Sequence, residues 1–500
     1  MNRREFVAGA AAVAAMSRVG RAQGAPLTVT LREDEAMPTV PADFTGLSYE
    51  LAQLTDASFF SAKNRELVAY FKLLSPAGVL RLGGNTSEFC WLRTGSAEAP
   101  KLHALAGDQD ANWMPHELFA IEPHAIEELA GFLKATGWRL IYGLNFGNSS
   151  PERAAEEAAL VAKAVGDRLE YFQIGNEPDL YTQANNGTRP ADWSFVDYVQ
   201  EWLDRVRAIG ARVPAARFGG PDVAASSEWV TRFGKTVSGE RLVALTGHYY
   251  AAGPPDDSSV TIARLLKGNA QLAAETRTLA AAARAEKRAY RMTEGNSCYR
   301  GGKPGMSDAF AASLWAAEYL LTLAANGCAG ANLHGGQSKY LTAGLGGHTP
   351  GMKVAQGPQA MPSGFYTPIR TEPGTEMRAM PVYYGMLLAQ QFAGATMLRC
   401  ETGAKSGDVA VFAGQMKKDT RVAVINKSAA AVDVTIGGMG GVKHATLWRL
   451  EAPRLDATEG VMLGGAEIAA GAKWAPRAES VGEDLRVRVA GTSAVVVFLS

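Results

Sequence analysis

Short apolar runs alternate with longer stretches of helical periodicity between residues 42 and 394 of this 500-residue chain. Eight of the apolar runs have the length of buried strands and end at glycine or polar residues. The stretches between them are rich in Ala, Leu, Glu and Arg, which favour helices. This alternation predicts a parallel sheet built from repeated strand and helix units. The strand candidates are residues 44–49, 78–82, 139–145, 171–175, 216–219, 242–248, 289–293 and 330–334.

The clearest helical stretches are residues 151–165, 195–209, 262–285 and 308–326. Eight strands that alternate with helices are the number needed to close a (β/α)8 barrel of the triosephosphate isomerase (TIM) type, an α/β fold. In this fold the carboxyl ends of the strands form the active-site face, so the residues there converge in space. Polar residues collect at these positions: Glu50, Asn85, Asn145, Asn176, Glu177, Asp222, His248, Tyr249, Tyr250, Glu294, Asn296 and His334.

After residue 394 the pattern changes to short alternating runs separated by turn residues. Such runs are typical of antiparallel strands with one buried face, and they predict a C-terminal antiparallel β-sandwich. We expect an early run at 27–32 to join this sandwich as an N-terminal strand. The predicted sandwich strands of the C-terminal part are residues 409–412, 421–426, 432–436, 444–450 and 494–499.

The predicted domains follow from these patterns. They are an export signal peptide at 1–25, a sandwich strand at 26–41, the catalytic barrel at 42–394 and the β-sandwich at 395–500. A stretch rich in Gly and Pro at 342–375 predicts a long loop over the active-site face of the barrel.

The first residues favour export from the cytoplasm to the periplasm or beyond. Arg3 and Arg4, followed by Phe6, precede an apolar stretch at 7–16 and a small-residue site at 22–25. The paired arginines resemble those of twin-arginine signals, and an ordinary secretory signal is the alternative. The apolar run is shorter than the roughly 20 residues that span a membrane, so we expect neither a membrane anchor nor a membrane partner.

Charge and cysteine content narrow the functional classes. The chain carries 50 basic and 50 acidic residues, so it has no long-range attraction to nucleic acid. Its four cysteines lack the short paired spacing of a zinc site, and no His-Glu-x-x-His motif is present. We therefore expect neither a metal nor an organic cofactor.

Two glutamates, Glu177 and Glu294, each end an apolar run and stand before a turn of Gly, Pro or Asn. At the carboxyl ends of barrel strands, both side chains would project into a cleft lined by loops. Cleavage of a glycosidic bond requires two such groups, one to protonate the leaving oxygen and one to attack or to activate water. A single glutamate after a strand is more often a capping or salt-bridged group, but two in matched contexts on one barrel favour catalysis. A retaining pair should lie about 5–5.5 Å apart.

Three segments together resemble glycoside hydrolase family 79, which contains bacterial β-glucuronidases and the heparanases. They are residues 81–89 (RLGGNTSEF), 173–178 (QIGNEP) and 293–299 (TEGNSCY). The Asn-Glu-Pro motif is shared by a large clan of retaining barrel glycosidases, whereas the other two segments are more specific to family 79. The resemblance extends over the whole exported chain. It implies a retaining exo-β-glucuronidase whose partner is a carbohydrate with terminal β-linked glucuronate.

The resemblance also implies roles for individual residues near the reacting bond. Glu177 would be the general acid and base, and Glu294 would be the nucleophile. Asn176 would hydrogen-bond the sugar 2-hydroxyl, an interaction that strengthens in the transition state. Tyr250 would hold the nucleophile ionised and oriented, and its neighbour Tyr249 is equally available for this role.

Recognition of the sugar carboxylate would separate a glucuronidase from a glucosidase. The resemblance implies Tyr299 for this contact, in a loop where Arg300 stands in place of the glycine of the family pattern. Arg300 would contact the carboxylate, meet a second sugar unit, or remain an exposed surface charge. Tyr340 and Asp110 are further candidates for substrate contact.

Two other functions remain open at this point. One is endo-cleavage of an acidic polysaccharide, as in heparanase, which needs an open cleft; the long loop favours the exo reading. The other is a noncatalytic carbohydrate-binding protein on the same scaffold, against which the two intact glutamates argue. We interpret His248 and His334 as structural hydrogen-bonding groups, because the glutamates already supply the acid and the base.

Overall fold

The computed structural model describes residues 26–32, 37–94, 98–102, 114–115, 117–183, 188–237, 239, 241–346, 364–403 and 408–500. The predicted export signal at 1–25 and the candidate residue Asp110 lie outside the described residues. So do residues 347–363, the middle of the long loop predicted at 342–375. The described residues contain no helix long and apolar enough to cross a membrane.

The predicted (β/α)8 barrel is confirmed. Parallel strands close in the order in which they occur along the chain, and all eight strand candidates take part. The barrel strands are β2 (Thr45–Glu50), β3 (Val79–Gly83), β6 (Arg139–Leu144), β7 (Leu169–Ile174), β8 (Phe218–Val223), β9 (Leu242–Tyr250), β10 (Ala289–Asn296) and β11 (Ala331–Gly335).

Helices surround the barrel, and one prediction about them is wrong. The single helix expected at 262–285 is two helices, because Gly268 ends the first with a φ of 69° that a helix cannot contain. By contrast, α3 has the predicted bounds, with Ser150 as its N-cap and Pro151 in its first turn. The helices are α1 (Arg65–Leu74), α2 (Pro123–Thr136), α3 (Pro151–Val165), α4 (Phe195–Arg212), α5 (Ser227–Thr236), α6 (Ile262–Lys267), α7 (Leu272–Ala285), α8 (Phe310–Ala325), α9 (Ser338–Ala343) and α10 (Pro381–Gln390).

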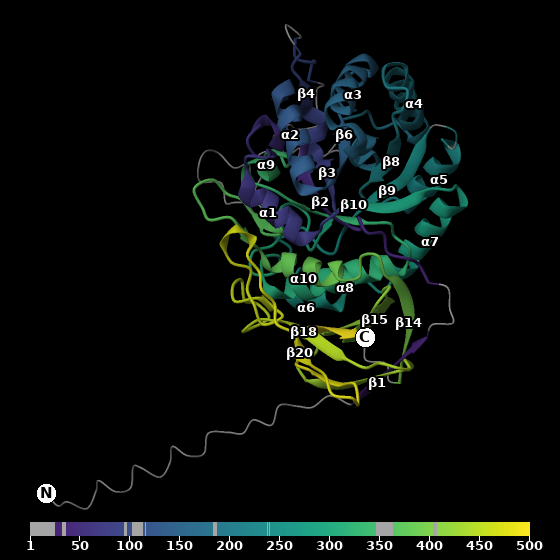
Figure 1. The fold of residues 1–500 in the computed structure, drawn as a ribbon. Helices are drawn as coiled ribbons and strands as arrows, with labels where there is room; N and C mark the ends of the chain where they lie inside the picture. Colours follow the sequence, from purple (N-terminus) through teal and green to yellow (C-terminus); the bar gives the residue numbers. More distant parts are fainter. Residues whose placement is uncertain are drawn as a thin grey trace, which may run out of the picture.

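Two of these helices, α8 and α10, lie between the barrel and the sandwich (Figure 1). Nearly every side chain of both is buried, as expected of helices covered on opposite sides. A Cβ atom at Gly385 would overlap the backbone carbonyl of Ser313, so glycine permits their close approach. One hydrophobic core therefore continues from the barrel through this helix layer to the sandwich.

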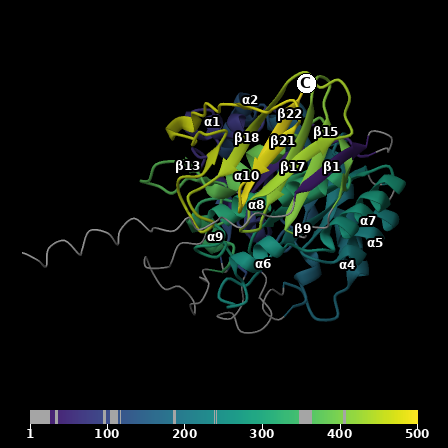
Figure 2. The same cartoon turned by 90° about the horizontal axis from the view of Figure 1, so that it is seen from below.

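The sandwich forms largely as predicted, and β1 from the N-terminal side of the barrel joins it (Figure 2). The domain is not wholly antiparallel, because β1 pairs parallel with β17 and antiparallel with β14. Apolar residues from both ends of the chain pack in its core. The strands are β1 (Leu27–Arg32), β14 (Thr396–Thr402), β15 (Val409–Gln415), β16 (Thr420–Asn426), β17 (Val432–Gly437), β18 (Ala445–Glu451), β19 (Met462–Leu463), β20 (Glu479–Ser480), β21 (Arg486–Val489) and β22 (Ser493–Leu499).

Short pairs complete the described fold: β4 (Cys90–Leu92) with β5 (Phe119–Ile121), and β12 (Ile369–Arg370) with β13 (Arg378–Ala379). The cysteines Cys90, Cys298, Cys328 and Cys400 are all free thiols, so no disulfide links the barrel to the sandwich.

Candidate active site

A cavity of about 440 Å³ opens at the carboxyl ends of the barrel strands. This volume is within the range of about 300–1,000 Å³ that is typical of small-molecule sites. Strands β2, β9, β10 and β11 and the segment after β7 contribute to its wall. The residues around it include Glu50, Glu177, Tyr250, Glu294, Tyr299 and Arg300.

Glu177 and Glu294 meet in this cavity although they come from different strands. Glu294 lies in β10, whereas Glu177 follows β7 in a left-handed conformation with a φ of 51°. The N–H of Glu177 donates to the Asp222 carbonyl at 2.9 Å and helps to hold this unusual backbone. An oxygen of Glu177 lies within 4.8 Å of an oxygen of Glu294. This approach fits the carboxyl separation of about 5–5.5 Å in retaining glycosidases rather than the roughly 6.5–9.5 Å of inverting ones.

The surroundings of Glu294 favour its ionised form. Arg81 Nη1 donates to Glu294 Oε2 at 2.6 Å, and the Tyr250 hydroxyl donates to Oε1 at 2.7 Å. Burial alone raises the pKa of Glu294, but the positive potential of His334, His248 and Arg81, with the Tyr250 hydrogen bond, lowers it to about 2. Glu294 is therefore a carboxylate at neutral pH, as a nucleophile must be.

The surroundings of Glu177 favour its protonated form. Burial raises the pKa of Glu177, and the negative charge of Glu294 acts in the same direction. The contact with His248 Nδ1, at 2.9 Å, only partly opposes these effects. Two carboxyl groups whose environments move their pKa values apart are a signature of a site with one acid and one nucleophile.

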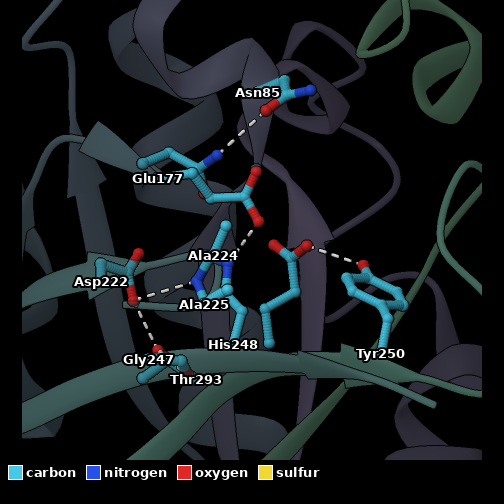
Figure 3. A network of polar contacts seen from close by, with 12 residues as sticks. Asn85, Glu177, Asp222, Ala224, Ala225, Gly247, His248, Tyr250 and Thr293 are labelled. Carbon is cyan, nitrogen blue, oxygen red and sulfur yellow. Dashed lines mark hydrogen bonds and ion pairs between the residues drawn. The ribbon is translucent and has the colours of Figure 1, made fainter. Parts of the chain in front are cut away.

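His248 connects Glu177 to Asp222 (Figure 3). The imidazole is fully buried, and its Nε2 lies 3.1 Å from Asp222 Oδ1. This contact pairs the imidazole with the buried Asp222 carboxylate. Burial lowers the pKa of His248, but the charges of Asp222 and Glu294 outweigh burial and raise it to about 10. His248 is thus a cation held between Glu177 and Asp222.

Arg81 connects several polar side chains of the site. Its guanidinium, only 1% exposed, donates to Glu294 and Asp222 at 2.6 Å each and to Asn176 Oδ1 at 2.8 Å. A Cβ atom at Gly83 would overlap this guanidinium, which explains a glycine at the end of β3. The buried guanidinium forms an ion pair with each of two carboxylates, so it holds both side chains in place and its own charge is not left unpaired.

The structure brings several predicted substrate-binding residues to the cavity. Tyr250, Tyr299 and Arg300 lie on its wall. Asn176 is buried and is not among the described residues that line the cavity, but its Nδ2 donates to the wall residue Asn85, at Oδ1, at 3.0 Å.

Two predicted residues face elsewhere. Tyr249 stacks on Tyr319 with ring centroids 5.3 Å apart, because neighbours on a strand point to opposite sides. Of the two tyrosines, Tyr250 is the one whose hydroxyl contacts Glu294. Tyr340 is 4% exposed and its hydroxyl lies 3.0 Å from Thr55 Oγ1, away from the cavity wall.

Other wall residues had no predicted role. Glu50 Oε2 accepts from the Thr86 N–H at 2.9 Å and from the Thr86 hydroxyl at 2.6 Å. Tyr366 reaches the wall from the segment after residue 363. Glu50 was visible in the sequence as a polar residue ending a strand, but no local pattern points to Tyr366.

Glu177, His248 and Glu294 also have atoms within 4.8 Å of one another, a spacing that a metal ion would accept. The charges nearby oppose this use. Arg81 already occupies one side of Glu294, and the raised pKa of His248 leaves its ring protonated rather than free to ligate. The arrangement suits proton transfer and nucleophilic attack better than metal binding.

Comparisons with known proteins identify two curated proteins with similar sequences. No protein-family model matches the chain. The chain is 27% identical over 341 residues to a β-glucuronidase of Aspergillus niger, covering 62% of this chain and 61% of that protein. It is 25% identical over 351 residues to a β-glucuronidase of Neurospora crassa, covering 62% and 60%. The chain thus spans about three fifths of the length of the curated relatives it matches.

Solved structures show the same fold over nearly the whole chain. A 4-O-α-L-rhamnosyl-β-D-glucuronidase of Fusarium oxysporum superposes with a TM-score of 0.69 at 16% identity, covering 94% of this chain and 99% of that one. An arabinofuranosidase of glycoside hydrolase family 51 from Xanthomonas axonopodis superposes with a TM-score of 0.62 at 18% identity, covering 95% and 100%. At these identities the likeness shows the fold alone.

Proposed function

We propose that the protein is a retaining exo-β-glucuronidase of the family 79 type. The observation that carries the proposal is the pair Glu177 and Glu294, with oxygens within 4.8 Å and pKa values moved in opposite directions. The β-glucuronidase relatives support the substrate class. The N-terminal pattern at 1–25 supports export of this enzyme.

The reaction then proceeds in two displacements. Glu294 attacks the anomeric carbon while Glu177 gives its proton to the glycosidic oxygen, so the aglycone leaves as a neutral alcohol. Glu177, now ionised, takes a proton from water, and the resulting hydroxide displaces Glu294 from the anomeric carbon. The sugar is released with its original configuration, and both glutamates return to their starting states. Arg81 and Tyr250 orient Glu294 during both steps.

The sugar carboxylate would be bound by Tyr299 and Arg300. Both lie on the cavity wall beyond Tyr250, whose ring is 6.3 Å from that of Tyr299. Arg300 supplies a positive charge on a wall that also carries Glu50, Glu177 and Glu294. A bond from guanidinium to carboxylate is stronger than one to a neutral hydroxyl, so this part of the wall favours glucuronate over glucose.

Aryl β-glycosides that differ only at C6 test the proposed substrate. The kcat/KM for the glucuronide should exceed that for the glucoside by about 10–100-fold, because the neutral C6 hydroxyl of the glucoside cannot form the charge-assisted bond with Arg300. Replacing Arg300 by Gln should lower kcat/KM for the glucuronide by about 10–100-fold, the loss expected when one hydrogen bond to a charged group is removed. Arg207→Gln, at an exposed position on α4, is the matched control. A glucoside cleaved as fast as the glucuronide would contradict the assignment.

The pH dependence of kcat/KM should report the two carboxyl groups. Activity requires Glu294 ionised, so it is lost as pH falls toward about 2. It also requires Glu177 protonated, so it is lost as pH rises through the raised pKa of that group. In His248→Gln both groups lose a neighbouring positive charge, so both pKa values rise and both limbs move to higher pH. His124→Gln, at an exposed position on α2, should leave the profile unchanged; limbs that stay in place in His248→Gln would count against this account.

Endo-cleavage of an acidic polysaccharide is the second candidate, supported by the position of Arg300 on the wall, where it would meet a neighbouring acidic sugar. Residues 347–363, on which the exo reading partly rested, lie outside the described residues. Release of glucuronic acid from an aryl glucuronide without shortening of heparan sulfate would support exo action, whereas a rapid fall in chain length would support endo action.

A further inference from the structure

A fully buried glutamate, Glu88, contacts the turn that carries Glu177. It lies in the short helix η2 (Asn85–Phe89), which follows β3, and it is 0% exposed. It is not among the described residues that line the active-site cavity, and the reaction described above does not use it. The N–H of Asn176, the residue before the acid, donates to Glu88 Oε1 at 2.8 Å. Glu88 is therefore linked to the acid through the backbone.

The two oxygens of Glu88 bind the ends of neighbouring strands. Oε2 accepts from the N–H of Phe146 at 3.0 Å and from the N–H of Gly147, both of which follow β6. Oε1 accepts from Asn176, which follows β7. A Cβ atom at Gly147 would lie only 3.0 Å from Glu88 Oε2, so glycine leaves room for this approach. Because β3, β6 and β7 are adjacent in the barrel, one side chain connects three consecutive strand ends.

Tyr181 extends these contacts to the other side of the turn. Its hydroxyl hydrogen-bonds the Glu88 carboxyl group, and the Asn176 N–H reaches the same hydroxyl at 3.3 Å. Tyr181 directly follows the short helix η5 (Pro178–Leu180), which begins after Glu177. Residues on both sides of the acid are therefore connected to the one buried carboxyl group.

The backbone of this turn requires support from its surroundings. Gly175 and Glu177 have positive φ values of 92° and 51°, and a residue with a side chain keeps such a conformation only where other contacts fix it. Two hydrogen bonds supply this support. The Asn176 N–H donates to Glu88, and the Glu177 N–H donates to the Asp222 carbonyl.

Loss of the first hydrogen bond should displace Glu177 more than the side chain of Asn176. The Asn176 amide group is also held by Arg81 at 2.8 Å and by Asn85 at 3.0 Å. Among the described residues, the Glu177 carboxyl group hydrogen-bonds His248 alone. The direction of this carboxyl group therefore depends on the backbone that carries it.

We propose that Glu88 is a positioning residue that holds the turn at 175–178 so that Glu177 points at the glycosidic oxygen. The proposal rests on the proposed function, because it assigns Glu177 as the acid and base. Glu88 itself would take no part in proton transfer. It would affect the rate through the placement of Glu177, and a displacement of about 1 Å costs on the order of 10²-fold in rate.

Two glucuronides with different leaving groups test the proposal. Glu88→Gln keeps the shape of the side chain, but its amide nitrogen cannot accept a hydrogen bond, so the N–H groups on one side lose their partner. We expect kcat/KM to fall by about 10–100-fold for methyl β-glucuronide, whose alcohol must be protonated as it leaves. For dinitrophenyl β-glucuronide, whose phenol leaves without protonation, kcat/KM should fall by less than about threefold. Initial rates measure both values.

Glu157→Gln is the matched control for the loss of a buried carboxyl group. Glu157 on α3 is also buried and accepts a hydrogen bond, from the Tyr142 hydroxyl at 2.7 Å. This variant should leave the ratio of the two kcat/KM values unchanged. Thermal unfolding verifies that each variant is folded. If Glu88→Gln does not fold, Tyr181→Phe removes one hydroxyl from the same contacts and should change the ratio in the same direction.

A double variant separates positioning of the acid from a general structural role. In Glu177→Gln the group that Glu88 positions is already absent. Adding Glu88→Gln should therefore lower kcat on methyl β-glucuronide by less than about twofold further. A structural role independent of Glu177 would instead multiply the two losses.

Three results would overturn the proposal: an unchanged rate on methyl β-glucuronide in Glu88→Gln, equal losses on both glucuronides, or multiplied losses in the double variant. An unchanged ratio in Tyr181→Phe would do so where Glu88→Gln is unfolded. If the C6 comparison shows cleavage of glucosides rather than glucuronides, the substrate class alone is rejected, and methyl and dinitrophenyl β-glucosides serve for the same test of Glu88. If the unaltered protein cleaves no β-glycoside, both proposals are rejected.

Discussion

Replacing Glu294 by Gln should lower kcat on an aryl β-glucuronide by roughly 10⁴-fold or more, the scale on which loss of a catalytic nucleophile acts. The amide has nearly the shape of the carboxylate but cannot form the glycosyl ester with the anomeric carbon. Arg81 keeps its ion pair with Asp222 at 2.6 Å, so we expect the variant to remain folded. Initial rates, together with thermal unfolding, measure both effects.

Two further variants separate chemistry from stability at this position. Glu294→Asp retains the negative charge beside Arg81 but withdraws the carboxylate by one methylene group, and a displacement of about 1 Å costs on the order of 10²-fold in rate. Glu228→Gln, which removes an exposed carboxylate from α5, should change neither rate nor stability. If Glu294→Gln kept more than a few per cent of the activity, another group would have to be the nucleophile.

Replacing Glu177 by Gln should produce the second-largest effect, and the effect should depend on the leaving group. For an alkyl glucuronide, loss of the general acid should lower kcat by about 10²–10⁴-fold. An aryl glucuronide with an acidic phenol leaves without protonation, so its first step should be nearly unaffected and the glycosyl-enzyme should accumulate as a burst. Rapid-mixing measurements of phenol release detect that burst.

Added azide distinguishes this role of Glu177 from a purely structural one. Azide needs no general base, so it should attack the accumulated intermediate and restore turnover of the aryl substrate as a β-glucuronyl azide. His248 remains in contact with the isosteric amide, so the site should keep its shape. Equal losses on both substrates, with no response to azide, would mean that Glu177 is not the acid and base.

The barrel and its central pair could be predicted from the sequence because both leave local signals. Strands buried on both faces read as continuous apolar runs, and the run at 171–175 ends at Asn176 and Glu177. The closed order of strands then forces residues at the carboxyl ends together. The convergence of Glu177 and Glu294 is thus a consequence of topology.

The orientation of single side chains was harder to predict. Tyr249 and Tyr250 are adjacent residues of the same type, so the sequence does not distinguish them. The register of β9 decides which of them faces Glu294. Tyr340 lies in the short helix α9, whose rotation directs the ring to Thr55. Strand β14 was missed because exposed and partly buried residues do not alternate regularly along it.

The residues that contact Glu177 and Glu294 could be picked out in the sequence, but their contacts with one another could not. Arg81 occurs within one of the three segments that resemble family 79, and Asp222 and His248 stand at strand ends. Their ion pairs join β3, β8, β9 and β10, which lie far apart along the chain. No local pattern reveals that His248 bridges Asp222 to Glu177, yet this contact partly offsets the rise that burial causes in the pKa of Glu177.

The central claim is that two carboxyl groups, too close to admit a water between them, cleave the bond by double displacement. Proton NMR of the first sugar released from an aryl β-glucuronide tests it most directly. We predict that the β-anomer of glucuronic acid appears first and that the α-anomer grows in later through mutarotation. Initial release of the α-anomer would show a single displacement by water and would contradict the account.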